Sequence, residues 1–520
     1  MKKWMVFFVL FPSQFLAAQK VLYSPLFDGN GAVRHYQMAG KVASTYWVIR
    51  EGKIPYGSRP SERNPGRDFE GYEIYNDRLE NINSIDRAYR SVDVVKTYFV
   101  PGDKYFDEMM IADKQNHTVL RVNRYAPAGN LIWQERSIDS LPFHERANNF
   151  LLLRSEDQSR ILLLAFENLF FSNPRVHAML FNEEWNLLSY KTYTHEWLTQ
   201  PMIQYDEFNF PVEPFSNSPV KLTNDGSWMM ISPSRMNQNY LLFHFAPGDS
   251  GFTWKELKVP PAANIEDIGL SVDNENRQAF TGILCRLRYP TLKMVSLARY
   301  LLDEKKLVYD SSFKFNTLSG GKTKNENLVE ENFISLPHGG FVLLKEYGRL
   351  YSSALNDESD FDSRPEAGRL LDDIVATPDA PAPVNRDGYT RYGNLTGPSS
   401  KYNRGDLSLF YFPSVSADSI WSGIINKEQV TELNSAYLSY LVIPYEDRLF
   451  LLYNSYFRNE EQYGSTTILD KKGNPLDEGG IVFWKLRNTL LFQRARQISA
   501  NEVMIPYTRN RSEGFALIRF

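Results

Sequence analysis

The clearest pattern along the chain is a pair of short apolar runs separated by turn residues. Residues 119–125 and 131–138 are both rich in apolar and aromatic side chains, and Ala-Pro-Ala-Gly-Asn separates them. Pro127 presets a φ near −65° and Gly129 tolerates a positive φ, so the two residues together favour a tight turn. The pattern therefore predicts a β-hairpin.

The second half of this hairpin recurs, because other segments also place an aromatic residue in an apolar run that follows a turn. The recurring aromatic residues are Trp133, Tyr190, Trp254, Tyr309 and Trp421. Repetition of one supersecondary unit predicts an array of similar sheets. We expect these aromatic side chains to be packed between neighbouring sheets.

From residue 93 onward the predicted strands fall into seven sets, six with four strands and a last set with three. Residues 44–50, with the sequence STYWVIR, supply a candidate fourth strand for the last set. Pairing the N- and C-terminal strands in one sheet closes a ring and removes two exposed sheet edges. The prediction is thus an all-β fold, a single β-propeller of seven four-stranded blades. A pair of β-sandwiches is the alternative that such a pattern leaves open.

The predicted propeller extends over residues 19–520 and contains three long connections, at about 51–90, 196–218 and 351–405. Loops of this length are uncommon in compact domains unless they carry function or are disordered. They are therefore the first places to look for binding residues.

The N-terminus has the pattern of a secretory signal peptide. Lys2 and Lys3 precede a largely apolar run at 4–16, and Ala17-Ala18-Gln19 offers small residues for cleavage. We expect residues 1–18 to be removed and the protein to be exported, to the periplasm, the outer surface or the medium. An uncleaved anchor is the alternative, but the run is short for a membrane span.

Neither the composition nor the motifs indicate a catalytic, metal or nucleic-acid-binding site. The formal net charge is −4, which offers no general attraction to nucleic acid, and the one cysteine, Cys285, excludes a disulfide framework. No two of the seven histidines lie three or four residues apart, so no metal site or cofactor is predicted. Paired acids such as Asp206-Glu207 are interpreted as solvated turn residues, although glycosidases also use two carboxylates.

One short stretch resembles known families. Residues 222–232, LTNDGSWMMIS, are similar to the strand–Asp-Gly–strand unit of TolB-like and WD40-like propellers. Thr223, Asp225, Gly226 and Trp228 also resemble a sialidase Asp-box, one residue short. With its leader and aromatic-rich array, the chain resembles uncharacterised exported propellers of Bacteroidota. The resemblance implies the fold and no particular activity.

Two of the long connections carry the candidate binding residues, for which we expect no catalytic role. They are Trp197, Tyr205, Phe208, Phe210, Arg386, Tyr389, Arg391 and Tyr392. Exposed aromatic and Arg side chains are frequent in protein interfaces, although the same rings could instead pack back onto the propeller. The sequence favours a non-enzymatic binding or scaffold propeller with a protein partner in the cell envelope or outside it. A carbohydrate-active or carbohydrate-binding propeller that uses the central funnel is the alternative.

Overall fold

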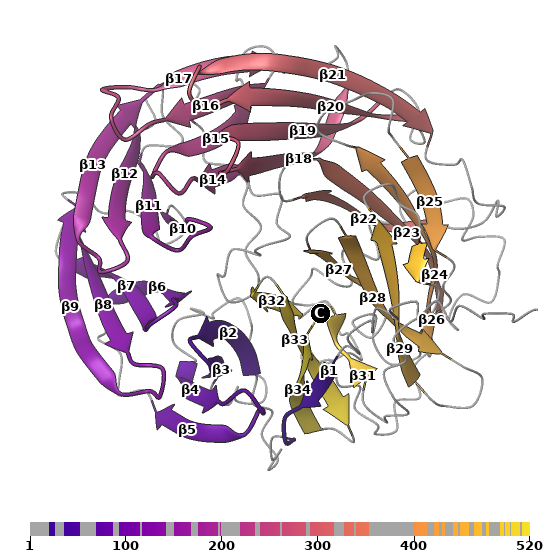
Figure 1. Ribbon diagram of the computed structural model, residues 1–520, viewed down its shortest axis with the longest axis horizontal. Helices are drawn as coiled ribbons and strands as arrows, with labels where there is room; N and C mark the ends of the chain where they lie inside the picture. The colour runs from indigo at the N-terminus through magenta and orange to yellow at the C-terminus, as the bar shows by residue number, and fades with distance from the viewer. Residues whose placement is uncertain are drawn as a thin grey trace, which may run out of the picture.

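In the computed structural model the strands form eight antiparallel sheets, which follow one another in chain order around a ring (Figure 1). The structure describes residues 20–26, 36–51, 69–86, 93–114, 117–141, 150–167, 175–195, 198, 219–233, 240–259, 263–287, 292–316, 327–336, 340–352, 400–412, 421–425, 429–431, 440–445, 448–456, 462–470, 475–477, 489–492, 495–499, 501–509 and 512–519. The prediction of an all-β propeller with four-stranded blades is confirmed. Among these residues no helix is long and apolar enough to cross a membrane.

The first five blades each contain four consecutive strands, and the first strand is the innermost. Blade 1 is β2 (Tyr36–Val42), β3 (Thr45–Glu51), β4 (Phe69–Tyr75) and β5 (Asn81–Asp86); blade 2 is β6 (Val94–Pro101), β7 (Phe106–Lys114), β8 (His117–Tyr125) and β9 (Leu131–Leu141); blade 3 is β10 (Phe150–Arg154), β11 (Arg160–Glu167), β12 (Arg175–Asn182) and β13 (Leu187–Thr194); blade 4 is β14 (Val220–Leu222), β15 (Trp228–Pro233), β16 (Tyr240–Phe245) and β17 (Thr253–Leu257); blade 5 is β18 (Asn264–Asp273), β19 (Gln278–Arg286), β20 (Leu292–Leu301) and β21 (Lys306–Asn316).

The last three blades complete the ring. Blade 6 is β22 (Asn327–Ser335), β23 (Phe341–Ser352), β24 (Ser400–Phe412) and β25 (Trp421–Ile425), with β26 (Gln429–Thr431) beside β24; blade 7 is β27 (Tyr440–Tyr445), β28 (Arg448–Tyr456), β29 (Gln462–Asp470) and β30 (Pro475–Asp477); blade 8 is β31 (Thr489–Leu490), β32 (Arg496–Ser499), β33 (Glu502–Arg509), β34 (Ser512–Arg519) and, outermost, β1 (Lys20–Tyr23).

The sequence-based count of seven blades becomes eight because residues 36–86 form a blade of their own. β3, which contains most of residues 44–50, lies between β2 and β4 instead of completing the last sheet. The predicted connection at 51–90 is corrected in the same way, since β4 and β5 lie within it. The fourth strand of blade 7 is β30.

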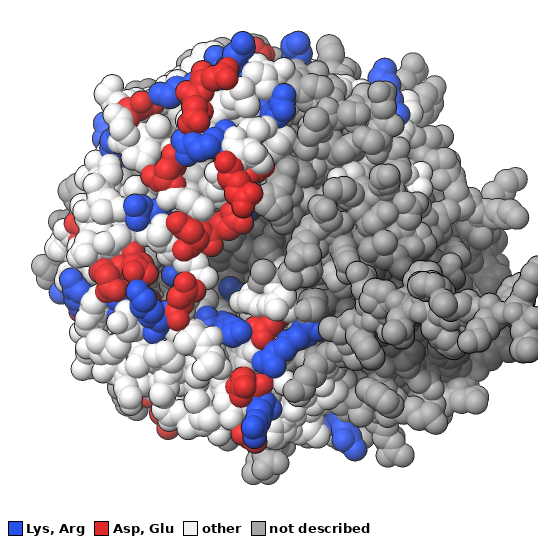
Figure 2. Space-filling view, in the orientation of Figure 1, with Lys and Arg blue, Asp and Glu red and all other residues white. Residues whose placement is uncertain are grey.

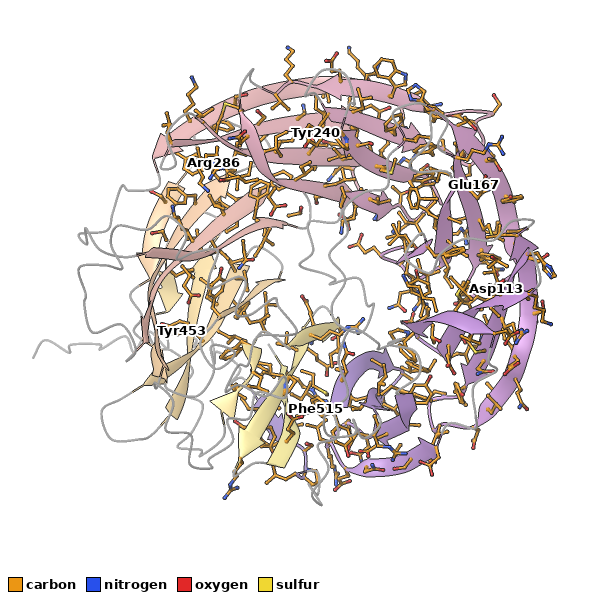
Figure 3. The ribbon with its side chains drawn as sticks, turned by 180° about the vertical axis from the view of Figure 1, so that it is seen from behind. Asp113, Glu167, Tyr240, Arg286, Tyr453 and Phe515 are labelled. Atoms are coloured by element: carbon orange, nitrogen blue, oxygen red, sulfur yellow. The ribbon has the colours of Figure 1, made fainter. Side chains whose placement is uncertain are left out.

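Closure of the ring by its two ends is confirmed, but the N-terminal strand that pairs is β1. It forms an antiparallel pair with β34 from Lys20↔Arg519 to Tyr23↔Ala516. Ser24 extends the pairing, because its amide donates to the Phe515 carbonyl at 2.8 Å and its hydroxyl accepts from the Phe515 amide at 2.8 Å. Apolar side chains, among them the labelled Phe515, fill the blade (Figure 3).

Apolar side chains also join the blades to one another. The described residues form eight apolar clusters that each span one junction between consecutive blades, including the junction of blade 8 with blade 1. Strands β7 and β11 are buried on both faces for nearly their whole length, which explains their continuous apolar sequences. The outermost strands β5, β9 and β13 are instead mostly exposed.

The described pairing predicts that β1 stabilises the entire ring. Replacing residues 20–24 with a Gly-Ser linker should remove the partner of β34 and the burial of Val21, Leu22 and Tyr23. The free energy of unfolding should fall by about 3 kcal/mol in urea titrations, because the three side chains are partly buried and each would contribute about 1.5–3 kcal/mol if it were fully buried. The exposed Leu26 provides the control, since Leu26→Ser should change little. Unchanged stability of the linker variant would contradict closure by β1.

Candidate functional site

The residues that the sequence put forward as binding residues cannot be placed. All eight lie outside the described residues: Trp197, Tyr205, Phe208, Phe210, Arg386, Tyr389, Arg391 and Tyr392. They remain predictions. The described part of the chain shows a different candidate, on the outer side of the ring.

The large apolar side chains that are exposed gather on the outermost strands. Seven of the eight in the described part of the chain belong to β5, β9, β13 and β17, the fourth strands of blades 1 to 4. These seven, which we call the apolar rim, are Ile82, Leu131, Ile132, Leu187, Leu188, Tyr190 and Trp254, with exposed fractions of 42–49%. Large exposed apolar patches are typical of interaction surfaces.

The expectation that the repeated aromatic residues pack between blades is wrong for two of them. Tyr190 is 43% exposed and Trp254 is 42% exposed. Trp133 is partly buried against the junction of blades 2 and 3. The side chains of Tyr309 and Trp421 lie outside the described part of the structure.

Trp133 is held by two cations and a buried ion pair. The guanidinium groups of Arg124 and Arg136 lie 4.0 and 4.2 Å from its ring centroids. Arg124 also donates two hydrogen bonds of 2.8 Å to the carboxylate of Asp107, which accepts a third from the indole of Trp185 in blade 3. This network ties blades 2 and 3 together, so we interpret these charges as structural.

A relay of three polar side chains fixes the exposed Tyr190. His177 Nε2 lies 3.0 Å from the Glu167 carboxylate, and His177 Nδ1 lies 2.9 Å from the Tyr190 hydroxyl. A carboxylate only accepts, so Nε2 donates to Glu167; Nδ1 also lies 3.2 Å from the Thr192 hydroxyl. The imidazole and phenol rings also stack, with an interplanar angle of 17°. Glu167 is labelled in Figure 3 at the end of β11.

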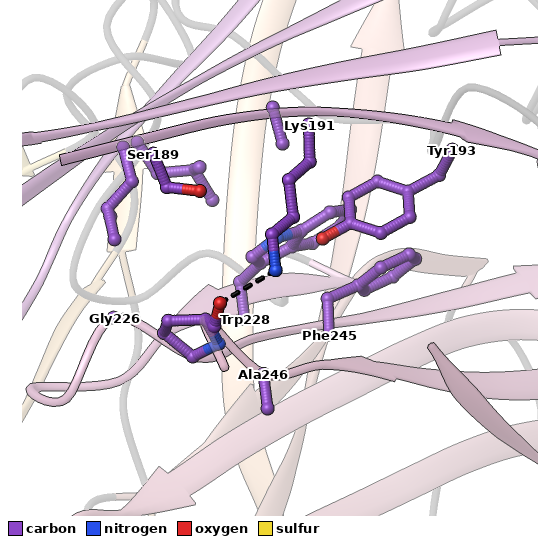
Figure 4. Close-up of a pocket in the computed structure, with 11 residues that line it drawn as sticks. Ser189, Lys191, Tyr193, Gly226, Trp228, Phe245 and Ala246 are labelled. Atoms are coloured by element: carbon purple, nitrogen blue, oxygen red, sulfur yellow. Dashed lines mark hydrogen bonds between the residues drawn. The ribbon is translucent and has the colours of Figure 1, made fainter. Parts of the chain in front are cut away.

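On the other face of β13, Lys191 points into a small cleft between blades 3 and 4 (Figure 4). Its ammonium donates 2.6 Å to the carbonyl of Pro247 and also to that of Asp249. Beside it, Trp228 and Phe245 stack with ring centroids 3.6 Å apart. The cleft is too small for more than a water-sized molecule, so we interpret it as a packing defect at the junction and not as a ligand site.

The turns on one face of blades 1 to 5 are strongly acidic. These are the turns between first and second strands and between third and fourth strands, at 43–44, 76–80, 102–105, 126–130, 155–159, 183–186, 223–227, 246–252, 274–277 and 302–305. They contain twelve Asp and Glu against four Lys and Arg, a net formal charge of −8. Figure 2 shows these carboxylates around the described part of the ring. We call this surface the acidic face.

Two acids of the acidic face are used to build their own turns. Asp157 accepts from the Ser155 hydroxyl and the Ser159 amide, at 2.6 and 3.0 Å. Asp225 accepts from the Ser227 amide and from Arg277, both at 2.8 Å. Burial alone would raise the pKa of Asp225, but these hydrogen bonds and one from Thr223 outweigh it and hold the pKa at about 2. Such a carboxylate is a poor proton donor at neutral pH.

The turn that resembles a propeller hairpin is a junction between three blades. Gly226 has a φ of +88°, and a Cβ on it would lie 2.8 Å from Leu180 of blade 3, so glycine is required. The Asn224 side chain accepts from the Asp157 amide, and the Asn224 amide donates to Asn274 of blade 5. The residues that suggested a family therefore have a structural role here.

Other reactive side chains among the described residues are buried and inert. Burial raises the pKa of Cys285 to about 12, which keeps the thiol protonated. Burial lowers the pKa of Lys96 to about 8, but its ammonium faces the Tyr98 ring at 4.8 Å on the innermost strand of blade 2. No group of three or more His, Cys, Asp and Glu in the described ranges is arranged to hold a metal ion.

Comparisons with known proteins identify no family for this chain. No family model matches it, and no curated protein matches it. Several solved structures resemble it weakly. The Dos1 propeller is 9% identical, with 95% of this chain and 94% of that chain covered and a TM-score of 0.37. The β-propeller domain of the Trilobed protease from Pyrococcus furiosus is 8% identical, with 83% and 93% covered and a TM-score of 0.33. The polysaccharide lyase Uly1 is 9% identical, with 94% and 99% covered and a TM-score of 0.32. No activity follows from likenesses of this size.

The buried His244, between blades 4 and 5, makes stability depend on pH. Burial lowers its pKa, as does the nearby Lys305, and its Nε2 has no hydrogen-bond partner. The native ring therefore stays neutral at a pH where the unfolded chain, with a pKa near 6.5, binds a proton. Stability contributed by the neutral ring is complete above about pH 6.5 and is lost as the pH falls below it.

Unfolding free energies measured between pH 7.5 and 5 test this. We expect the unfolding free energy to fall as the pH is lowered, with up to about 1.4 kcal/mol per pH unit contributed by His244. His244→Gln should lower the slope, whereas replacing the exposed His117 should leave it unchanged. Equal slopes for wild type and His244→Gln would show that His244 does not titrate in this way.

Proposed function

We propose that this chain is an exported, non-enzymatic binding or scaffold propeller that engages a protein partner in the cell envelope or outside it through the apolar rim. The observation that carries the proposal is the concentration of seven exposed large apolar residues on four consecutive outermost strands. Apolar residues scattered at random over a surface need no partner, but a repeated position on adjacent blades favours one.

The composition of the rim also supports a protein partner. Tyr and Trp are enriched among the residues that contribute most to protein binding, and Tyr190 and Trp254 both belong to the rim. Leu and Ile supply the flanking apolar area. A polar surround is present too, because the acidic face begins at the turns that precede β5 and β13.

Two of the turn carboxylates do not have the property that the carbohydrate alternative requires of an acid catalyst. A glycosidase needs one carboxylic acid with a raised pKa to protonate the leaving group. The turn carboxylates of Asp157 and Asp225 have lowered pKa values, because hydrogen bonds to their ionised forms outweigh the effect of burial. These two acids therefore suit turn formation better than proton transfer.

Export is proposed from the sequence of residues 2–19 alone. Expression with a C-terminal tag should give a protein outside the cytoplasm whose N-terminus, read by mass spectrometry, is Gln19. Replacing Lys2 and Lys3 by Glu should reduce export, because a signal peptide requires a positive N-terminal region. A full-length protein in the cytoplasmic fraction would overturn this part of the proposal.

Binding through the rim is tested by replacing Leu131, Ile132, Leu187 and Leu188 with Ser in one variant. These side chains are exposed, so the variant should keep its circular dichroism spectrum and stability within about 1 kcal/mol. Cross-linking in envelope fractions should recover specific partners with the wild type and lose them with the variant. Leu26→Ser, which changes an exposed leucine away from the rim, is the matched control. Recovery of the same partners by the rim variant would place the binding surface elsewhere.

A further inference from the structure

The outer edge of β13 is less protected than the edges of its neighbours. Natural edge strands avoid unwanted pairing by being short, by carrying charges or by bulging. β17 has only five residues and includes Lys255 and Glu256. β9 includes Glu135 at a φ of +44°, and its pairing with β8 shifts register three times. Both are poor templates for another strand.

β13 has less of this protection, because its one bulge lies near its start, at Leu188, where the pairing with β12 shifts register. Its eight residues, LLSYKTYT, favour extended structure, and it pairs with β12 in one unbroken register from Ser189 to Thr194. No described strand pairs with its outer edge. Its single charged residue, Lys191, donates hydrogen bonds to the carbonyls of Pro247 and Asp249 in blade 4. The charge therefore does not hinder another strand from pairing with this edge.

The side chains on one face of β13 are already ordered. Leu188 and Tyr190 occupy alternate positions and are exposed. The relay of Glu167 and His177 holds the phenol of Tyr190 in one orientation. An exposed ring that is fixed before binding loses less conformational entropy when a partner contacts it, which favours affinity.

We propose that β13 binds an extended segment of a partner protein by β-strand addition, so that the segment becomes a fifth strand of blade 3. This proposal rests on the proposed function and specifies its contact. Main-chain hydrogen bonds to the free edge supply general affinity, and apolar side chains of the segment pack beside Leu188 and Tyr190.

Charge decides the chemistry of the segment. Glu183 and Glu184 precede β13. Each already pairs with a cation, Glu183 with Lys104 at 3.5 Å and Glu184 with Arg124, but the side chain of Glu183 is half-exposed and the acidic face around it has a net formal charge of −8. The fitting segment therefore alternates apolar with polar residues and carries Lys or Arg at the end that lies beside Glu183. A second copy of this chain is the other occupant that the test below distinguishes.

The test uses a random library of twelve-residue peptides displayed on phage and selected against the full-length mature chain. Selected peptides should alternate apolar and polar residues and contain a basic end. Binding of the best synthetic peptide should slow amide hydrogen exchange in residues 187–194. Leu188→Lys should weaken binding of this peptide at least about tenfold. The control is Ile132→Lys on β9, because Ile132 and Leu188 are equally exposed at 48% and 49% and both lie on outermost strands.

Peptides with N-methyl groups on alternate amides separate strand addition from side-chain contact. Methylation of the amides that face β13 should abolish binding, whereas methylation of the opposite set should be tolerated. Tyr190→Phe should weaken binding less than Leu188→Lys, since it keeps the ring and removes its hydrogen bond to His177.

The following outcomes would overturn the proposal. If both methylated peptides bind normally, or if no selected peptide protects residues 187–194, strand addition at β13 is wrong. If the wild type forms a dimer that Leu188→Lys disrupts, the occupant is a second copy. If β13 variants keep partner binding while Ile82, Leu131 and Trp254 variants lose it, the rim binds without strand addition. If no rim variant affects binding, the proposed function fails as well.

Discussion

The pairing of β1 with β34 is the contact on which the rest of the structure depends. Each blade packs only on its two neighbours, so every junction is complete only when the ring is closed. At the closing junction Glu502 of β33 accepts from Lys41 at 2.6 Å, from Tyr46 at 2.9 Å and from Arg519 at 2.8 Å. Burial would raise the pKa of Glu502, but these donors outweigh it and lower the pKa. The carboxylate therefore stays ionised and joins blade 8 to blade 1.

Closure also determines where a partner can bind. The inner strands pack between blades, and two of the turn acids, Asp157 and Asp225, accept hydrogen bonds that shape their own turns. What remains accessible is the outermost strand of each blade, which packs on one side only. In most described blades this strand is short, charged or bulged. In blade 3 this strand is bulged only at Leu188 and pairs regularly from Ser189 to Thr194, and its one charged residue, Lys191, is bonded to blade 4.

Sequence patterns predicted the elements far better than the side-chain positions. The hairpin of β8 and β9 and the four strands of blade 4 lie where apolar runs and turn residues indicated. Blade 1 was missed because β5 exposes most of its side chains and reads as a loop. Tyr190 and Trp254 were misplaced because they lie on the outermost strands β13 and β17, most of whose side chains are exposed or half-buried.

The candidate site could not have been found from the sequence, because it depends on where Lys191 points and on what holds Tyr190. If Lys191 faced solvent, the same eight residues would form an edge whose charge hinders pairing with another strand. The most direct test of the account is a photo-reactive amino acid placed at Leu188 in the native protein, with illumination of intact envelopes. The account predicts a covalent adduct between Leu188 and one partner protein, and none when the same group replaces Leu26. Adducts of equal yield and identity at both positions, or none at Leu188, would contradict it.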